Sequence, residues 1–228
     1  MYNMDEFKKE SLKDNFFELM MEYPYAKDPE RKKQIINKAI KFTNQIPEFK
    51  GWPQDDKAFW NAESFMWHSK INKELRKTIQ NELSKRTGQK NLDLGSGNVA
   101  YTNSTVVDYS PEMLDQNPNP DKVLHNLEEP LPFDTESFDS VSAVFVFNYI
   151  SNVPNFIKEI KRVLITNGKL TIVQPEKVNH LYNLHVKNNY DEASLRVLLK
   201  KSGFRTESTT KKIGNNQITF YFCEKKFS

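Results

Sequence analysis

The chain has 228 residues, which suffices for one α/β domain with a helical extension and for a sizeable buried core. Hydrophobic residues make up 37% of the sequence and charged residues 28%, a balance that excludes an intrinsically disordered chain. The formal net charge of +3 is too small to indicate a strongly basic surface for nucleic acid.

Composition also bears on the compartment. No apolar run approaches the roughly 18 residues of a membrane span, and the charged N-terminus lacks the apolar core of a signal peptide. The single cysteine, Cys223, excludes an internal disulfide and fits a reducing compartment. We therefore expect a cytoplasmic protein without a membrane partner.

The first 87 residues predict a helical extension. Residues 3–22 have an amphipathic pattern, and Asp28-Pro29 combines an N-cap with proline at the first helical position. Asp55 can cap a third helix, and a fourth helical stretch runs to about Thr87. All three tryptophans lie between residues 52 and 67, where they either pack this extension on the next domain or form a lid over a site.

Two short apolar runs follow, each ending at polar residues. Residues 91–94 lead into Gly95-Ser96-Gly97, and residues 105–107 end on Asp108. Such runs are typical of neighbouring strands in a parallel α/β sheet, where ligands bind outside the carboxyl ends of the strands. Glycines let the backbone approach a ligand closely, and a carboxylate at the next strand end suits a ribose diol.

Residues 93–97 (DLGSG) and 108–114 (DYSPEML) resemble two motifs of the class I S-adenosylmethionine-dependent methyltransferases, of the type 11-like kind. A downstream helix–glycine–strand pattern resembles the same family in Glu159, Arg162, Val163, Leu164, Gly168, Leu170 and Pro175. The resemblance is strong over residues 90–175 and loose over residues 176–228. It implies a Rossmann-like, seven-stranded, mostly parallel sheet with an antiparallel C-terminal hairpin over residues 88–228, preceded by the helical extension or lid of residues 1–87.

Further elements follow in chain order. We expect strands at residues 123–125, 137–147, 169–173, 204–210 and 218–224, with helices at residues 155–166 and 191–201. Asn167-Gly168 closes the first of these helices, and residues 214–216 turn the final hairpin.

The resemblance also implies roles in holding S-adenosylmethionine. Asp93 lies near the methionine ammonium, the backbone of Gly95 and Gly97 approaches the ligand, and Asp108 holds the ribose hydroxyls. The other expected contacts of the cofactor are Ser96, Tyr109, Met113, Asn126, Leu127 and Phe147. Asn126 stands where an Asp is usual in the family, so its adenine contact carries no charge.

The acceptor side offers fewer residues. Asn148 and Tyr149 end the fourth strand of the sheet, nearest the methyl donor in the resembled fold, and are candidates for touching the substrate. Together with Tyr149, His180 and His185 are candidate general bases, needed only where the acceptor atom must lose a proton. The histidines are five residues apart with no cysteine nearby, so we expect no metal site.

One departure from the family concerns the first helix of the α/β domain. Only eight residues, 98–105, separate Gly97 from Val106, and Tyr101 lies among them. They span about one and a half helical turns plus a connection. We therefore expect the helix to be shortened or lost, and residues 1–87 to fill part of the gap.

Three alternatives remain open. Gly95-x-Gly97-x-x-Ala100 fits a dinucleotide fingerprint, although the helix that this fingerprint needs has no room. A non-catalytic binding protein could use the same fold through its helical extension. The methyl acceptor, which we expect to be a small molecule, could instead be a protein or an RNA. The oligomeric state stays open.

Overall fold

The computed structural model describes residues 4–176, 181–214 and 216–226. It divides into two compact units, residues 1–67 and residues 68–228. We expected the division at 87/88. It lies earlier because helix α5 (Lys73–Ser84) packs against the sheet of the second unit.

The first unit is helical. It contains α1 (Met4–Glu22), η1 (Tyr23–Tyr25), α2 (Pro29–Thr43), η2 (Pro47–Phe49) and α3 (Asp56–Glu63). Both expected caps are confirmed: Asp28 accepts a hydrogen bond from the Glu30 N–H, and Asp55 accepts one from the Ala58 N–H at 2.8 Å. Each cap satisfies a backbone donor that has no partner inside its helix, which fixes where the helix begins.

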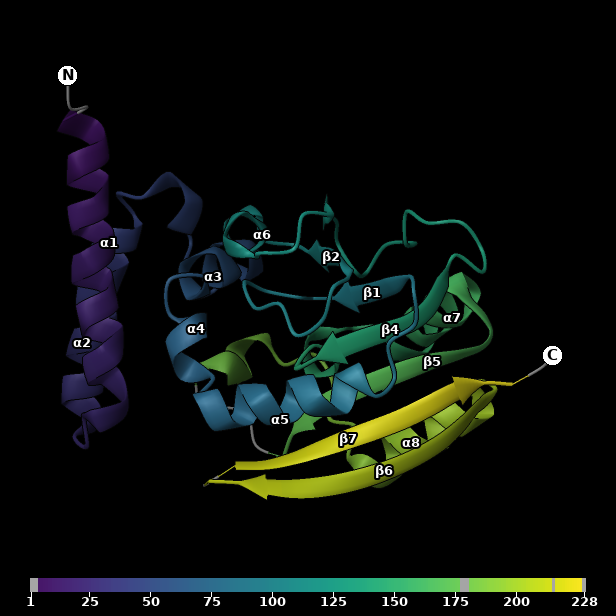
Figure 1. Ribbon diagram of the computed structural model, residues 1–228. Coiled ribbons are helices and arrows are strands. Elements are labelled where there is room, and N and C mark those ends of the chain that lie inside the picture. The colour runs from purple at the N-terminus through teal and green to yellow at the C-terminus, as the bar shows by residue number, and fades with distance from the viewer. Residues whose placement is uncertain (1–3, 177–180, 215, 227–228) are drawn as a thin grey trace. The chain divides into compact units, whose positions relative to one another are not determined.

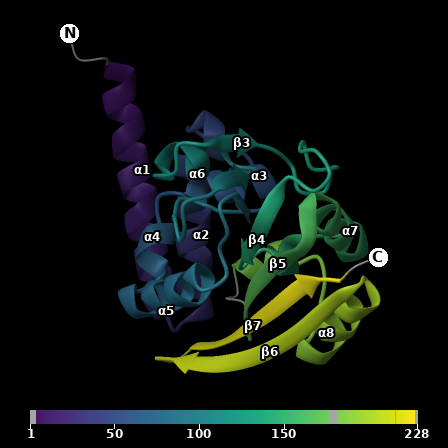
Figure 2. The ribbon, with the colours of Figure 1, turned by 45° about the vertical axis from the view of Figure 1, so that its right-hand side comes forward.

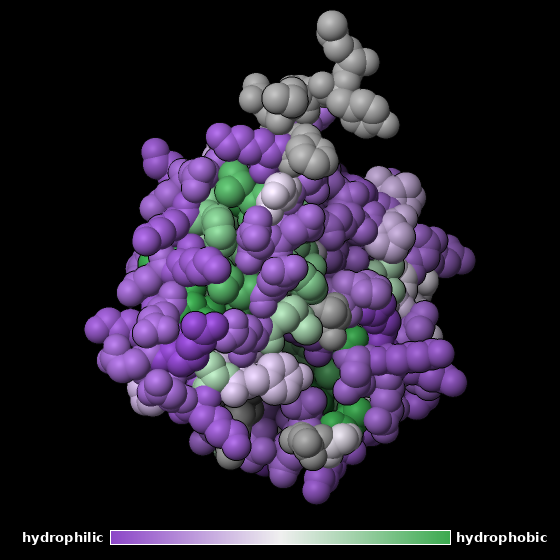
Figure 3. All heavy atoms as spheres, turned by 90° about the vertical axis from the view of Figure 1, so that its left-hand side faces the viewer, coloured by the Kyte–Doolittle hydropathy of each residue, from purple (hydrophilic) through white to green (hydrophobic). Residues whose placement is uncertain are grey.

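Aromatic rings form the core of this first unit. Phe16 of α1 is fully buried and meets the Trp52 ring edge-on at 5.1 Å between centroids, with Phe49 at 5.8 Å. These rings hold α1 against the segment that follows α2, and edge-to-face contacts of this kind are favourable beyond the buried area. The face on the side of α1 and α2 is largely hydrophilic, with hydrophobic side chains emerging among the charged ones (Figure 3). Helix α4 (Trp67–Lys70) crosses the division between the units.

A seven-stranded sheet organises the second unit, in the order β3-β2-β1-β4-β5-β7-β6. The strands are β1 (Asn91–Leu94), β2 (Thr105–Asp108), β3 (Lys122–Leu124), β4 (Phe138–Val144), β5 (Leu164–Pro175), β6 (Phe204–Ile213) and β7 (Asn216–Lys225). The first five are parallel, and β7 pairs antiparallel with both β5 and β6. The expected Rossmann-like fold with its C-terminal hairpin is confirmed.

Helices cover both faces of this sheet (Figures 1 and 2). Besides α5 they are α6 (Pro111–Gln116), α7 (Val153–Val163) and α8 (Glu192–Lys201), with short turns η3 (Phe147–Tyr149) and η4 (Tyr182–His185). Helices α7 and α8 share one face, where their apolar side chains join the strands in a single core that includes Val141, Ile157, Ile172, Leu195 and Leu199.

Helix α5 lies on the opposite face of the sheet (Figures 1 and 2). It buries Leu75, Ile79 and Leu83. Beyond its end the Arg86 guanidinium lies 4.2 Å from the centroid of the Phe222 ring, and Lys211 of β6 donates to Glu82 at 2.7 Å. The expectation that part of residues 1–87 covers the sheet is confirmed for α5.

The expected limits of α7 and β5 were wrong. The helix begins at Val153, two residues before its expected start, because the Asn152 side chain caps it by accepting a hydrogen bond from the Asn155 N–H. The backbone becomes extended at Leu164. Asn167 (φ +62°) and Gly168 then lie inside β5, where the pairing with β4 shifts register. The asparagine–glycine pair therefore makes an irregularity within a strand, because pairing with β4 stabilises the extended chain from Leu164 onward.

Candidate functional site

The glycine turn after β1 needs both of its glycines. Gly95 has φ +63° and Gly97 φ +57°, in the left-handed region that disfavours a side chain. A Cβ built on Gly95 would lie 2.4 Å from Cγ2 of Val146, so this position also lacks space. The N–H groups of Gly95 and Ser96 both donate to the carbonyl of Val107, which locks the turn onto the end of β2.

Asp108 ends β2 against this turn. Its Oδ2 accepts from the Gly97 N–H at 2.8 Å, and its Oδ1 accepts from the Ser110 N–H at 2.9 Å. Burial raises the pKa of Asp108, while hydrogen bonds from the backbone N–H groups of Ser110, Gly97 and Tyr109 oppose that rise. A carboxylate offers about four acceptor positions, so the three backbone N–H groups leave about one for a ligand hydroxyl.

Asp93 near the end of β1 is almost fully buried. Its Oδ1 accepts from the Ser142 hydroxyl of β4 at 2.7 Å. Burial raises the pKa of Asp93 to about 7; the Ser142 bond opposes this rise and the nearby Asp108 charge adds to it. A ligand cation beside Asp93 would favour its ionised form, so this carboxyl can exchange a proton for a bound ammonium near neutral pH.

Residues 95–104, which link β1 to β2, contain no helix, so the expected shortening is a complete loss. The loop carbonyls that a helix would satisfy internally are bound by asparagine side chains instead. Asn117 donates to the Gly97 carbonyl at 2.8 Å, Asn119 to the Thr102 carbonyl at 3.0 Å, and Asn91 to the Asn103 carbonyl at 3.0 Å. A loop without internal hydrogen bonds can be buried only when such partners exist.

These asparagines were missed by sequence reasoning. Asn117 and Asn119 are buried, at 2% and 6% exposure, although they lie in a proline-rich segment, 117–120, that reads as an ordinary surface turn. A sequence signal does exist: a loop too short for a full helix is followed within about 20 residues by several carboxamide side chains, Gln116, Asn117 and Asn119.

Tyr101 fills the space that the missing helix leaves. It is 4% exposed, and its hydroxyl is buried without a hydrogen-bond partner. Burial raises the pKa of Tyr101, with Asp93 adding to the rise and Arg76 of α5 opposing it, so the phenol stays a donor close to both groups. The Nε of Arg76 is likewise buried without a partner, while its Nη atoms reach the ring and the carbonyl of His68 at 2.9 and 3.1 Å.

The structure places the other expected cofactor residues around the turn and along the strand ends. Met113 is buried under the N-cap of α6, and Ser96 is buried with its hydroxyl on the Gly97 carbonyl. The Asn126 side-chain oxygen accepts a hydrogen bond from the Glu128 N–H, two residues along the chain. Leu127, between them, is buried. Phe147 lies 1% exposed in the core, with its ring 5.3 Å from that of Phe156.

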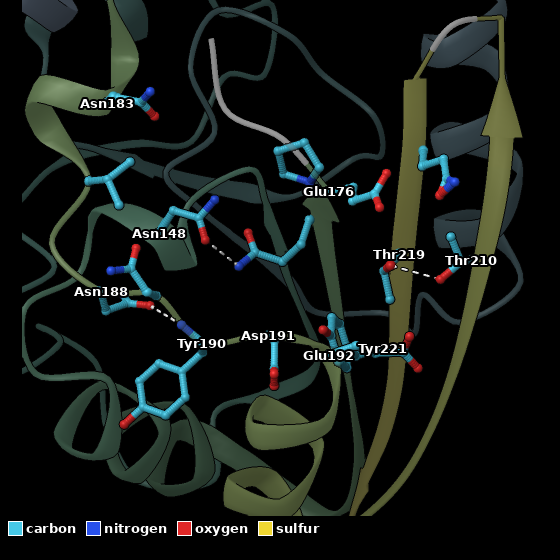
Figure 4. A pocket seen from close by; sticks show the side chains of 15 residues that line it. Asn148, Glu176, Asn183, Asn188, Tyr190, Asp191, Glu192, Thr210, Thr219 and Tyr221 are labelled. Carbon is cyan, nitrogen blue, oxygen red and sulfur yellow. Dashed lines mark hydrogen bonds between the residues drawn. The ribbon is translucent and has the colours of Figure 1, made fainter. Parts of the chain in front are cut away.

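A separate polar pocket of about 580 Å³ opens beside the carboxyl ends of β4 and β5 and the start of β7 (Figure 4). Carboxamide and hydroxyl side chains dominate its lining, among them Asn148, Gln174, Asn188, Thr219 and Tyr221. The size falls in the range of small-molecule sites.

The residues expected to contact the methyl acceptor lie at different places in the structure. Asn148 borders the pocket, where its carbonyl accepts from the Gln174 amide at 2.9 Å. Tyr149 follows it in η3 at intermediate exposure, and His185 is buried at 2% exposure in η4; neither is among the residues that line the pocket. His180 lies outside the described residues. Of the three expected residues that the structure describes, Asn148 alone lines the pocket.

Two searches of the described part of the chain gave negative results. No group of three or more His, Cys, Asp or Glu side chains there is arranged to hold a metal ion. No helix within those residues has the length and apolar character needed to cross a bilayer.

Comparison with known proteins agrees with this geometry. Residues 90–172 match the family model described as a methyltransferase domain. The demethylmenaquinone methyltransferase of Tropheryma whipplei (strain Twist) is 32% identical over 100 residues, covering 38% of this chain and 42% of that protein. That of Chlorobaculum tepidum is 30% identical over 157 residues, covering 63% and 61%. The chain thus spans about two fifths of the length of the first of these curated relatives.

Solved structures share the fold at low identity. A chain from the complex of the Haloferax volcanii Trm112 methyltransferase activator with a methyltransferase aligns with a TM-score of 0.62 and 16% identity, covering 77% of this chain and 98% of that one. An S-adenosylmethionine-dependent methyltransferase of Thermotoga maritima aligns at 0.60 and 16%, covering 73% and 98%. The Haemonchus contortus phosphoethanolamine N-methyltransferase 2, solved with S-adenosyl-L-methionine, aligns at 0.60 and 15%, covering 78% and 61%.

Proposed function

We propose that this chain, which carries a class I S-adenosylmethionine-dependent methyltransferase domain, transfers a methyl group to an oxygen or nitrogen atom of a small molecule. The relatives named above act, by their names, on demethylmenaquinone, which is also a small molecule. The pocket beside β4 and β5 has the volume of a small-molecule site, and its lining is mainly polar.

The observation that carries the proposal is the Asp108 carboxylate held against the glycine turn with no helix behind it. Asp108 can accept a ribose hydroxyl while keeping its bonds to the backbone. A dinucleotide needs a helix N-terminus for its pyrophosphate, and residues 95–104 provide none. An adenosyl sulfonium has no phosphate, so it does not need a helix N-terminus for a pyrophosphate.

The methionine end of the cofactor has suitable partners nearby. The buried hydroxyl of Tyr101 and the Nε of Arg76 are unsatisfied donors, which suit a carboxylate. Asp93 suits the ammonium group, whose charge would draw the proton off a carboxyl with a pKa of about 7. Two buried donors and one buried carboxyl thus match the carboxylate and the ammonium of an amino-acid moiety.

Bound S-adenosylmethionine would supply a methyl group on a sulfonium sulfur, which is electrophilic without activation by the chain. The chain therefore needs to orient the acceptor and exclude water, and a nucleophilic triad is unnecessary. Asn148 and Tyr149 at the end of β4 are the proposed orienting residues. His185 is a proposed general base that would require the turn around it to open, because its side chain is buried.

Calorimetric titration of S-adenosylmethionine and of S-adenosylhomocysteine tests the proposal. We expect dissociation constants in the micromolar range, about −8 kcal/mol. Asp108→Ala should weaken binding by roughly tenfold to a hundredfold, since a hydrogen bond to a charged group contributes about 1.5–3 kcal/mol. Asp115→Ala, which removes an exposed carboxylate from α6, is the matched control and should bind as wild type does.

Absence of binding to folded wild-type protein would overturn the enzymatic proposal. A non-catalytic protein of the same fold would then be the better explanation. Binding without turnover of small molecules would instead direct the search to protein or RNA acceptors.

A further inference from the structure

The pocket beside β4 and β5 has a marked charge pattern. Glu176, Asp191 and Glu192 are exposed residues of its lining, Glu176 after β5 and the adjacent Asp191 and Glu192 at the start of α8 (Figure 4). None of the described residues that line it is a lysine, an arginine or a histidine. Asp191 stays ionised because its carboxylate caps α8, and the hydrogen bonds from Ser194 lower its pKa. The pocket therefore presents three negative charges with no cation among these lining residues, an environment that repels anionic ligands.

The inner wall of the pocket is polar and not fully satisfied. Gln174 is 6% exposed, and its amide nitrogen donates to Asn148, the bond drawn at Asn148 in Figure 4. Its Oε1 is buried without a hydrogen-bond partner. A buried acceptor without a donor costs roughly 1–3 kcal/mol, so a ligand N–H reaching this carbonyl would recover a deficit already present in the fold.

Neighbouring groups fix the wall around that acceptor. Asn188 donates to the carbonyls of Phe147 and Ile150, which holds the 182–190 segment onto η3. The hydroxyls of Thr210 and Thr219 bond each other across the hairpin at 2.8 Å, as Figure 4 shows. The pocket is thus built from strand ends and a tied-down loop, which is the kind of preformed wall that small-molecule sites have.

The pocket also lies next to the glycine turn along the chain. Val146 fills the space beside Gly95, and Asn148, two residues later, borders the pocket. Two residues of chain span at most about 7 Å. The turn that would hold the methyl donor and the polar pocket are therefore separated by little more than η3.

We propose that this pocket binds the methyl acceptor, and that the acceptor is a small polar amine that is cationic at neutral pH and carries no anionic group. This inference rests on the proposed methyltransferase function. It excludes a long apolar quinone as the occupant, because Pro175 and Val186 are the only aliphatic side chains among the described lining residues. It also excludes phosphorylated and carboxylated acceptors, which the marginal acids would repel.

Three probes of matched shape test the charge preference. Tyramine, tyrosol and 4-hydroxyphenylacetate share a phenol ring and differ in carrying a cation, no charge or an anion. Each is titrated calorimetrically into protein saturated with S-adenosylhomocysteine, which cannot react. We expect tyramine to bind at least tenfold more tightly than tyrosol, and 4-hydroxyphenylacetate to bind more weakly than either.

Variants assign the preference to the pocket. Replacing Glu176 and Glu192 together by glutamine should weaken tyramine binding about tenfold or more and leave tyrosol nearly unchanged, since each exposed pair of opposite charges is worth roughly a factor of five. Glu207→Gln, which removes an exposed charge from β6 outside the lining, is the matched control and should change neither. Gln174→Leu should weaken tyramine and tyrosol together by removing the buried acceptor.

The outcomes separate this inference from the function on which it rests. Failure of S-adenosylhomocysteine to bind overturns the proposed function and is seen in a titration made before any probe is added. Normal S-adenosylhomocysteine binding with no tyramine binding, or with the anion bound as tightly as the amine, overturns the amine pocket alone. An unchanged tyramine affinity in the double glutamine variant does the same.

Discussion

The glycine turn and the polar pocket lie along the same edge of the sheet, but they are built differently. The turn draws its parts from residues 91–119, and its backbone groups are bound by Asp108 and by buried asparagines. The pocket draws its wall from residues between 148 and 221, and it keeps exposed acids and an unpartnered carbonyl. The backbone of the first region is satisfied by the protein's own side chains, with the Tyr101 hydroxyl left unpartnered beside it, whereas the second region has exposed acids and an unpartnered side-chain carbonyl.

This contrast predicts that changes at the turn alter folding as well as cofactor binding. Changes at the pocket should alter acceptor binding alone, as the tests given for Glu176 and Glu192 require. The predictions below concern the turn and its supports, and they run from the largest expected effect to the smallest.

Asp93→Asn should stabilise the cofactor-free protein in a pH-dependent way. The pKa of Asp93 is raised from 3.8 to about 7, so wild type loses stability as pH rises through that interval and then levels off. The gain of the variant over wild type should therefore grow by roughly 3 kcal/mol between pH 5 and pH 7.5. Chemical denaturation at the two pH values measures it. The same gain in unfolding free energy at both pH values would mean that Asp93 does not titrate between them.

The same variant should lose the pH dependence of cofactor binding. Wild type must lose a proton from Asp93 to pair with the ligand ammonium, so its affinity should fall about tenfold from pH 7.5 to pH 6. Binding by Asp93→Asn should be weak and flat over this range. Calorimetry in buffers of different ionisation enthalpy would reveal the released proton directly.

Gly95→Ala should destabilise the protein by about 2–3 kcal/mol. The new Cβ meets Val146 and is forced to a positive φ, so overpacking adds to backbone strain. Gly214→Ala is the matched control, since Gly214 has φ +57° but nothing within 4 Å of a Cβ. It should cost about 1 kcal/mol. Equal losses in urea denaturation would mean that space at Gly95 is not limiting.

Asn117→Ala should cost about 2 kcal/mol and weaken S-adenosylhomocysteine binding. It removes the donor to the Gly97 carbonyl and leaves that carbonyl buried. The exposed Asn103 provides the comparison, because Asn103→Ala removes no side-chain bond of this loop. A stability loss without any effect on ligand affinity would show that Asn117 supports the fold but not the shape of the turn.

Glu82→Gln should have the smallest effect, about 0.5 kcal/mol or less. Glu82 of α5 accepts from Lys211 of β6 at 2.7 Å and from Lys85 at 2.9 Å, and both lysines hold its pKa below the usual range. Ion pairs near the surface contribute little to stability, and the lysines of this one remain partly exposed. A loss above about 1 kcal/mol would mean that this pair, more than the buried apolar face, attaches α5 to the sheet.

The sequence by itself determined the elements that depend on local chemistry. The caps at Asp28 and Asp55, the glycine turn, the acidic end of β2 and the C-terminal hairpin each follow from a few adjacent residues. That the first helix is shortened or lost could also be predicted, because eight residues span at most about one and a half turns plus a connection. These features need no knowledge of what packs against them.

Only the tertiary structure decided the rest. The helix α5 belongs with the sheet because of the face that it buries, and β5 begins at Leu164 because β4 pairs with it there. The asparagines that hold the loop, the placement of Arg76 near Tyr101, and the acid-edged pocket all join residues distant in sequence. No local sequence pattern predicts these long-range contacts. Each depends on the order of the strands in the sheet and on which side chains remain without hydrogen-bond partners once the chain has folded.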